Sequence, residues 1–265
     1  MDVDVDGCVL RVGITGDGPT VLLIHGTAAA LWGEVIERLA LDHRVVEYDR
    51  RSFGGSVAEP LADTRRHTRD AAVLLERLAS GPAVVVGWSM GGVIALDLVC
   101  CRPELVSGVV VIEAPLFAKR RPRPDQVAGV IRAKRAAARG DSRAGATHFL
   151  NWALQRQGQK VSDLHRLPDP LREVVLANAA AIVREIDAGT GEAELTPSVL
   201  RGVNCPVRWL HGDSSAASFR TAARRAVRLL PNMTVVPVAG AGHMVQLDRP
   251  DAVVTAVGAL PLAAR

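Results

Sequence analysis

A glycine-flanked serine carries the strongest chemical signal in this chain of 265 residues. Gly-Trp-Ser-Met-Gly occupies residues 87–91, after an apolar run at 83–86 that reads as a buried strand and before a helical pattern at 93–99. This context is typical of a nucleophile elbow, a turn so tight that it needs glycine at positions 87 and 91 and projects the serine hydroxyl outward. We predict that Ser89 is a nucleophile. The next amide, that of Met90, would begin a helix and donate a hydrogen bond to developing negative charge.

A histidine near the C-terminus is the expected base, because a serine hydroxyl is a weak nucleophile until its proton is removed. His243 lies in the glycine-rich stretch 240–243, just past the last predicted strand at 235–238. Open α/β sheets keep their sites at the carboxyl ends of the strands. A lone histidine is more often structural, but this position combined with the elbow favours His243 as the catalytic base.

The segment His25-Gly26-Thr27 follows another predicted strand, at 21–24. Glycine at position 26 would let the backbone approach a substrate carbonyl, and the Thr27 amide would then join Met90 as a second oxyanion donor. An ordinary strand-to-helix turn is the alternative interpretation. His25 itself is predicted to be a structural hydrogen-bonding residue.

The rest of the chain alternates strand-like apolar runs with helical ones. Such alternation predicts an α/β fold with a mostly parallel central sheet and helices on both faces. Strands are predicted at 9–14, 21–24, 44–48, 83–86, 106–112, 207–210 and 235–238, and helices at 32–41, 64–79, 216–230 and from 251.

The alternation stops between about residues 116 and 196, where no convincing strand occurs. We predict an all-helical lid at 116–196, which divides the α/β core into residues 1–115 and 197–265. A helical excursion that only thickens the fold is the alternative. The helical stretches within this segment are predicted at 125–139, 142–157 and 169–186.

The charge of the chain does not favour nucleic acid as a partner. Net charge is +4, with much of the arginine between Lys119 and Arg143, but aromatic residues make up only 3% and are too scarce to interleave with it as stacking platforms. No apolar run approaches the roughly 20 residues that a membrane span needs. The N-terminus is acidic and lacks the order of a secretion signal, so a cytoplasmic protein is expected.

The four cysteines suggest neither a disulfide framework nor a metal site, because their spacing fits neither. Buried free thiols are the prediction, and no metal or cofactor is expected. The cysteines are Cys8, Cys100, Cys101 and Cys205.

Together these segments resemble the α/β-hydrolase superfamily over essentially the whole chain. The resemblance rests on His25-Gly26-Thr27, the block Asp-Arg-Arg-Ser-Phe-Gly-Gly-Ser at 49–56, the Ser89 elbow, the helical insertion and the His243 loop. In the second block, Ser52 stands where the family usually has glycine. The resemblance implies the α/β-hydrolase fold and a triad in the order serine, acid, histidine.

Two carboxylates compete for the acid, which would orient the histidine and stabilise its protonated form. The family usually carries the acid three residues after a glycine at a strand end; here that glycine is Gly212, and the third residue is Ser215. Asp213 lies one residue past the glycine. Glu113, after the strand at 106–112, is favoured instead, because a subset of the superfamily, including lactonases of the zearalenone-hydrolase type, is similar in placing its acid there.

The resemblance implies a serine hydrolase that cleaves a carboxylic ester or lactone of a hydrophobic small molecule through an acyl-enzyme. Phe117, Phe149, Trp152 and Trp88 are the candidate substrate contacts, although aromatic residues on helices more often belong to a core. Relatives that cleave C–C bonds or perform non-hydrolytic steps are one alternative. A ligand-binding protein on the same scaffold is another. The sequence predicts no oligomeric state.

Overall fold

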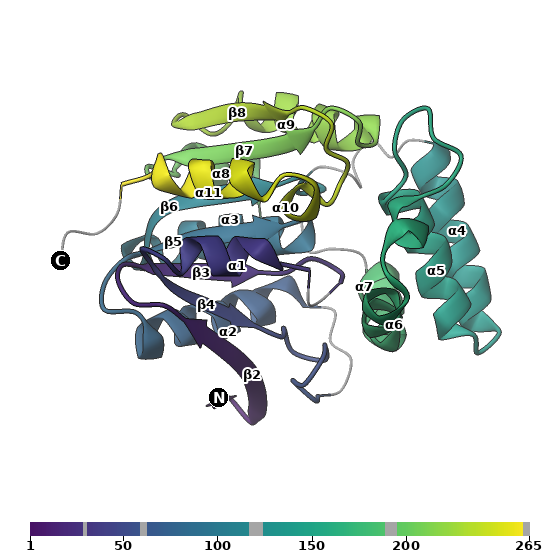
Figure 1. Ribbon diagram of the computed structural model, residues 1–265, viewed down its shortest axis with the longest axis horizontal. Helices are drawn as coiled ribbons and strands as arrows, with labels where there is room; N and C mark the ends of the chain where they lie inside the picture. The colour runs from purple at the N-terminus through teal and green to yellow at the C-terminus, as the bar shows by residue number, and fades with distance from the viewer. Residues whose placement is uncertain (29–30, 59–62, 117–123, 189–194, 262–265) are drawn as a thin grey trace.

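A twisted sheet forms the centre of the molecule (Figure 1). The computed structural model describes residues 1–28, 31–58, 63–116, 124–188 and 195–261. The strand at Asp2–Val5 pairs antiparallel with the one at Cys8–Thr15, which in turn pairs antiparallel with the one at Arg44–Tyr48; every other neighbouring pair is parallel. In sheet order the strands are β1 (Asp2–Val5), β2 (Cys8–Thr15), β4 (Arg44–Tyr48), β3 (Thr20–Ile24), β5 (Ala83–Trp88), β6 (Val106–Ile112), β7 (Val207–Gly212) and β8 (Met233–Val238).

Helices cover both faces of the sheet, as the alternation predicts (Figure 1). The central strands are apolar on both sides: in β5, Val85 packs into one core and Val84 and Val86 into the other, because successive side chains point to opposite faces. One face carries α1 (Glu34–Leu39), α10 (Val245–Asp248) and α11 (Pro250–Gly258). The other carries α2 (Thr64–Leu78), α3 (Met90–Cys101), α8 (Pro197–Arg201) and α9 (Ala217–Ala226), with a short 3-10 turn at Pro103–Leu105.

Four further helices form a separate group beside the sheet, on the right in Figure 1. We call residues 124–188 the helical segment; it contains no strand. The third predicted stretch is two helices, which meet at Asn178, whose side chain accepts a hydrogen bond from the Gly54 amide at 2.7 Å. The division into core and lid remains a prediction. The helices are α4 (Pro124–Ala138), α5 (Ser142–Ala153), α6 (Asp169–Ala177) and α7 (Ala179–Ala188), with a 3-10 turn at Asp163–Arg166.

The structure differs from the predicted elements at the N-terminal edge. Residues 2–5, read from the sequence only as an acidic terminus, form β1, because alternation buries Val3 and Val5 and leaves the aspartates in solvent. The helix predicted at 32–41 is shorter, since Gly33 before it has a φ of 45° and cannot continue a helical turn.

The cysteines are free, as predicted, but only Cys8 is fully buried. Cys101 is exposed, so the expectation of buried thiols is wrong there: it lies at the last position of α3, where the helix ends. Burial raises the pKa of Cys100 to about 12 and that of Cys205 to about 11, which keeps both thiols protonated and unreactive. Among the described helices, none is long and apolar enough to cross a bilayer.

Candidate active site

The turn between β5 and α3 has the geometry of an elbow. Ser89 adopts φ 52° and ψ −116°, a conformation that non-glycine residues rarely take. A Cβ at Gly87 would lie 2.2 Å from the Gly91 carbonyl oxygen, and one at Gly91 would lie 2.0 Å from that of Ile24. The two glycines are therefore required by close approach of the backbone, as the sequence pattern predicts.

A buried carboxylate meets the ring of His243. The Glu113 Oε2 atom lies 2.8 Å from His243 Nδ1, and the residues are 0% and 3% exposed. The other carboxylate oxygen accepts from the Gly212 amide at 2.8 Å and from the Ser215 hydroxyl at 2.5 Å. Burying a carboxylate is costly unless it is hydrogen-bonded, and both Glu113 oxygens are. Ser215, at the position where the family usually has its acid, thus donates a hydrogen bond to an acid from another strand.

Asp213, the alternative acid, forms its hydrogen bonds with groups other than His243. Its Oδ1 atom accepts from the Gly240 amide at 2.9 Å and from the Ser214 hydroxyl at 3.0 Å, both in exposed positions. These bonds join the loop after β7 to the loop after β8. Within the described residues, the Asp213 side chain makes no hydrogen bond to His243.

Two aromatic residues fix the position of His243. The indole of Trp88, the residue before Ser89, donates to the His243 carbonyl at 2.8 Å. The ring of Phe219, on α9, stacks on the imidazole with centroids 4.0 Å apart. With Nδ1 bonded to Glu113, the Nε2 atom is left for another partner. Phe219 was not among the predicted site residues, and no local pattern marks it, because the stacking depends on how α9 packs across the sheet.

A cavity of about 410 Å³ opens in front of the elbow. It joins Ser89 to the helical segment, and Phe149 and Trp152, two of the candidate substrate contacts, line it. Trp88 is buried below the elbow and is not among the lining residues, and Phe117 lies outside the described residues. Most of the wall is apolar, and its charged members are Lys134, Glu185 and Asp187. The principal apolar members are Val127, Val130, Ile131, Phe149, Trp152 and Phe219.

The two expected oxyanion donors reach the same cavity. Thr27 and Met90 line it beside Ser89, and a Cβ on Gly26 would lie 2.9 Å from the Ser89 Cβ atom. In the described part of the chain, neither the Thr27 nor the Met90 amide donates a hydrogen bond to another protein group. Both N–H groups are therefore available to a ligand oxygen.

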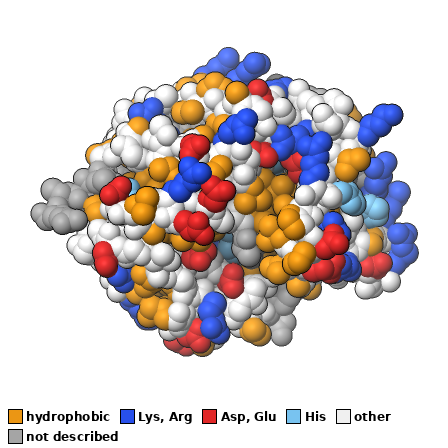
Figure 2. Space-filling view, viewed as in Figure 1, with side chains coloured by type: hydrophobic (Ala, Val, Ile, Leu, Met, Phe, Trp, Pro, Cys, Tyr) orange, Lys and Arg blue, Asp and Glu red, His pale blue; other side chains and the backbone are white. Residues whose placement is uncertain are grey.

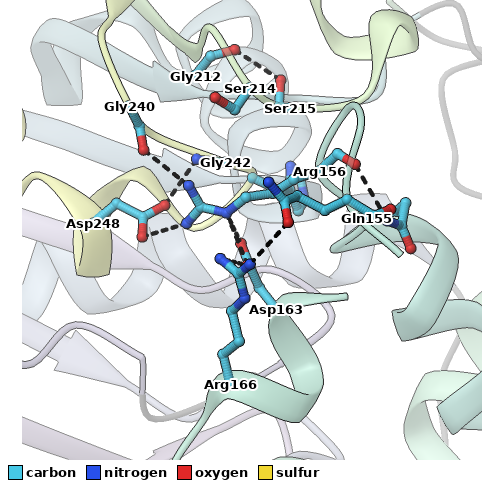
Figure 3. A network of polar contacts seen from close by, with 12 residues as sticks. Gln155, Arg156, Asp163, Arg166, Gly212, Ser214, Ser215, Gly240, Gly242 and Asp248 are labelled. Atoms are coloured by element: carbon cyan, nitrogen blue, oxygen red, sulfur yellow. Dashed lines mark hydrogen bonds and ion pairs between the residues drawn. The ribbon is translucent and has the colours of Figure 1, made fainter. Parts of the chain in front are cut away.

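An arginine network holds the loop at 240–243. Arg156, just past α5, donates to Asp163 at 2.8 Å, to Asp248 at 2.6 Å and to the Gly240 carbonyl at 2.8 Å, and Figure 3 shows its guanidinium between these groups. Asp248 in turn accepts from the Gly242 amide at 2.8 Å. The helical segment is thus bonded directly to the loop that carries the histidine, a contact between distant parts of the chain that the sequence does not indicate.

Replacing Arg156 by leucine is expected to lower the free energy of unfolding by about 2 kcal/mol, because Asp163, which is only 3% exposed, loses its closest cation. Urea denaturation measures this change. Arg166→Leu is the matched control, since Arg166 is exposed and reaches Asp163 only at 3.5 Å; its loss should cost less than about 0.5 kcal/mol. Equal losses in the two variants would contradict the anchoring role of Arg156.

Two buried histidines beside the site predict a loss of stability in mild acid. Burial lowers the pKa of His25 and of His67 well below the usual 6.5, and the guanidinium of Arg50 lowers both further. Below about pH 6.5 the unfolded chain therefore binds more protons than the folded one. The free energy of unfolding should fall by up to about 1.4 kcal/mol per pH unit for each histidine until the folded-state pKa is reached.

Urea denaturation between about pH 7 and pH 5 measures this slope. His67→Phe removes one titrating ring of similar size, so the slope should decrease by about half its value in that range. An unchanged slope in this variant would show that His67 does not contribute.

Comparisons with known proteins agree with this fold. A family model described as the alpha/beta hydrolase family matches residues 21–256. A pimeloyl-[acyl-carrier protein] methyl ester esterase of Xanthomonas campestris is 27% identical over 95% of this chain and 100% of its own length. An uncharacterized hydrolase of Bacillus subtilis is 38% identical over a shorter stretch, 39% of this chain and 40% of that protein.

Solved structures match over nearly the full length. A bromoperoxidase from Bacillus anthracis superposes with a TM-score of 0.79 at 24% identity, covering 95% of this chain and 96% of that one. A thermophilic esterase from Thermogutta terrifontis gives a TM-score of 0.75 at 25% identity, covering 97% and 94%. The elbow and the histidine loop occur along the sheet in the order that the resemblance implies. Because the family model also spans most of the chain, this chain belongs to the alpha/beta hydrolase family.

Proposed function

We propose that this protein is a serine hydrolase that cleaves carboxylic esters or lactones of hydrophobic small molecules through an acyl-enzyme. Ser89 is the nucleophile, His243 the base and Glu113 the acid. The observation that carries the proposal is the buried 2.8 Å contact between Glu113 and His243, whose carbonyl is bonded to Trp88, the residue before the elbow serine. Esterases among the full-length relatives support ester hydrolysis as the general activity.

The first half of the proposed reaction forms the acyl-enzyme. The Ser89 oxygen attacks the ester carbonyl carbon while His243 Nε2 takes the hydroxyl proton, and the carbonyl oxygen becomes negatively charged. The amides of Thr27 and Met90 donate to that oxygen, and the Glu113 carboxylate stabilises the imidazolium. When the tetrahedral intermediate collapses, the C–O bond to the leaving group breaks and His243 returns its proton to the departing alkoxide.

The second half repeats these steps with water. His243 removes a proton from water as it attacks the acyl carbon, and the same proton then goes back to the Ser89 oxygen as the acid is released. In a lactone the leaving alkoxide stays attached to the acyl group, so a single hydroxy acid is the product. No cofactor takes part in this proposal.

The cavity supports a hydrophobic substrate. Its wall is formed mainly by aliphatic and aromatic side chains from α4, α5 and α9. Figure 2 shows hydrophobic side chains gathered at the boundary between the core and the helical segment, and basic side chains toward the outer edge of that segment. Apolar burial would therefore provide most of the binding energy, and the two oxyanion amides would fix the orientation of the carbonyl.

A series of p-nitrophenyl esters from acetate to decanoate, together with lactones of increasing ring size, tests this proposal. A fast release of p-nitrophenol equal to the enzyme concentration is expected, followed by slower turnover. Mass spectrometry of the quenched enzyme should find the acyl group on the peptide that contains Ser89. Ligand-induced stabilisation without turnover of any ester or lactone would instead indicate a binding protein.

A further inference from the structure

The carbonyl of Gly26, next to the elbow, is held by two buried donors. Burial and the neighbouring Arg50 guanidinium lower the pKa of His25, so its ring is neutral. Its Nε2 atom accepts from the Arg50 amide at 2.8 Å, which leaves the ring proton on Nδ1, 2.7 Å from the Gly26 oxygen. The Arg50 side chain supplies the second donor, Nη2, at 2.8 Å from the same oxygen.

These two bonds determine the direction of the next N–H group. The peptide between Gly26 and Thr27 is planar and trans, so its C=O and N–H bonds point in opposite directions. With the carbonyl held toward Arg50 and His25, the Thr27 N–H is turned to the other side. Thr27 lines the cavity with Ser89, whose Cβ atom lies close against Gly26.

A carboxylate from the helical segment holds the arginine in turn. Glu185, on α7, accepts from Arg50 Nη1 at 2.5 Å, and the two residues are 5% and 0% exposed. His67 lies 3.8 Å from the same carboxylate oxygen, and the Arg50 guanidinium also stacks over the Phe53 ring. A planar guanidinium with one nitrogen on Glu185 and another on Gly26 has little freedom to turn.

We propose that Glu185, acting through Arg50, positions the Thr27 amide as an oxyanion donor. A helix of the helical segment, α7, thereby determines how strongly the oxyanion hole binds the charged oxygen. Glu185 and Arg50 are positioning residues in this assignment, which rests on the proposed function of Ser89 and Thr27. Glu185 also lines the cavity, so one helix both forms a wall for the substrate and orients the amide that receives the charge.

The test removes both charges together, because deleting one partner leaves the other buried and uncompensated. Arg50→Met with Glu185→Leu keeps the volume but releases the Gly26 carbonyl. We expect kcat per active site to fall about 30-fold, with KM within about twofold of wild type, because a tilted donor weakens binding of the transition state and not of the ester. Titration of active sites corrects kcat for any unfolded protein.

A trifluoromethyl ketone provides the specific readout. Ser89 adds to its carbonyl carbon, the hydroxyl proton passes to His243, and the resulting oxyanion occupies the hole. Its Ki should rise by about the same factor as kcat falls, whereas the Ki of the corresponding neutral alcohol should not change. The matched control is Arg143→Met with Glu173→Leu, an exposed ion pair on α5 and α6 that touches neither Arg50 nor Gly26 and should alter none of these values.

A rise in KM alone, or an unchanged ketone Ki, would overturn the positioning role. If the paired variant does not fold, Glu185→Gln, which keeps the shape of the side chain, must still lower kcat about fivefold at constant KM, and an unchanged kcat would refute the proposal. Turnover that survives in Ser89→Ala would refute the proposed function itself, whatever the Arg50 and Glu185 variants do.

Discussion

Replacing Ser89 by alanine is expected to lower kcat for a p-nitrophenyl ester by about 10⁴- to 10⁶-fold. The alanine methyl group cannot form the acyl bond, and only the binding cavity and the oxyanion amides would remain to accelerate the reaction. KM should change little, since the hydroxyl contributes little to binding of the ester. The fold should be retained, because alanine and serine bear the same Cβ atom at the φ of 52° observed there.

Stopped-flow and steady-state assays measure this loss, and the release of p-nitrophenol equal to the enzyme concentration should vanish with it. Ser214→Ala is the matched control: Ser214 is partly exposed, its hydroxyl bonds only to Asp213 among the described residues, and its loss should leave kcat within about twofold. A Ser89→Ala enzyme that keeps a tenth or more of the wild-type rate would exclude the serine as nucleophile.

Glu113→Gln is expected to lower kcat by about 10⁴-fold, because the glutamine holds His243 in the wrong tautomer. One glutamate oxygen accepts from the Gly212 N–H and the Ser215 hydroxyl, so the glutamine oxygen must occupy that side. The glutamine NH₂ group then faces His243 Nδ1, which has to become an acceptor. The ring proton moves to Nε2, where it blocks removal of the proton from Ser89.

Asp213→Asn is the built-in control for that experiment. Asp213 bonds to the Gly240 amide and to Ser214, and an asparagine oxygen can accept the same bonds. Its kcat should stay within about threefold of wild type. Measurement of kcat from about pH 6 to pH 9 for both variants decides between the two acids, because the loss in Glu113→Gln should persist across the range. Equal losses, or a larger one in Asp213→Asn, would reverse the assignment.

Local patterns in the sequence were sufficient to predict most of the sheet of this protein and its elbow. The strands β4 and β6 were predicted to the residue. In β6 a strand buried on both faces leaves an uninterrupted apolar run at 109–112. The elbow was equally visible, since the serine and the two glycines that identify it fall within five consecutive residues. Among the described strands, β1 was not predicted, because a four-residue edge strand with alternating aspartates resembles a solvated terminus. The short helices α8 and α10 were not predicted either.

Contacts between distant segments needed the folded chain. Glu113 and His243 are separated by 130 positions in the sequence, and only the sheet order β6-β7-β8 brings the loops after β6 and β8 together. The stacking of Phe219 on the imidazole and the bonds of Arg156 to Asp163 and Asp248 also form only in the folded chain. The contacts of Phe219 and Arg156 leave no periodic or spaced pattern in the sequence. Glu113 was favoured there only through the resemblance and through Ser215 at the usual acid position.

The sequence by itself determined which residues could do chemistry: a serine in a turn that excludes side chains, a histidine on a late glycine-rich loop, and a short set of carboxylates. The tertiary structure decided which carboxylate reaches the histidine and which helix lies behind the Gly26 carbonyl. The physical reason is the range of the forces involved. Backbone sterics and apolar periodicity act over a few neighbouring residues, whereas hydrogen bonds and ion pairs at the site join groups that come within about 3 Å only after the sheet has assembled.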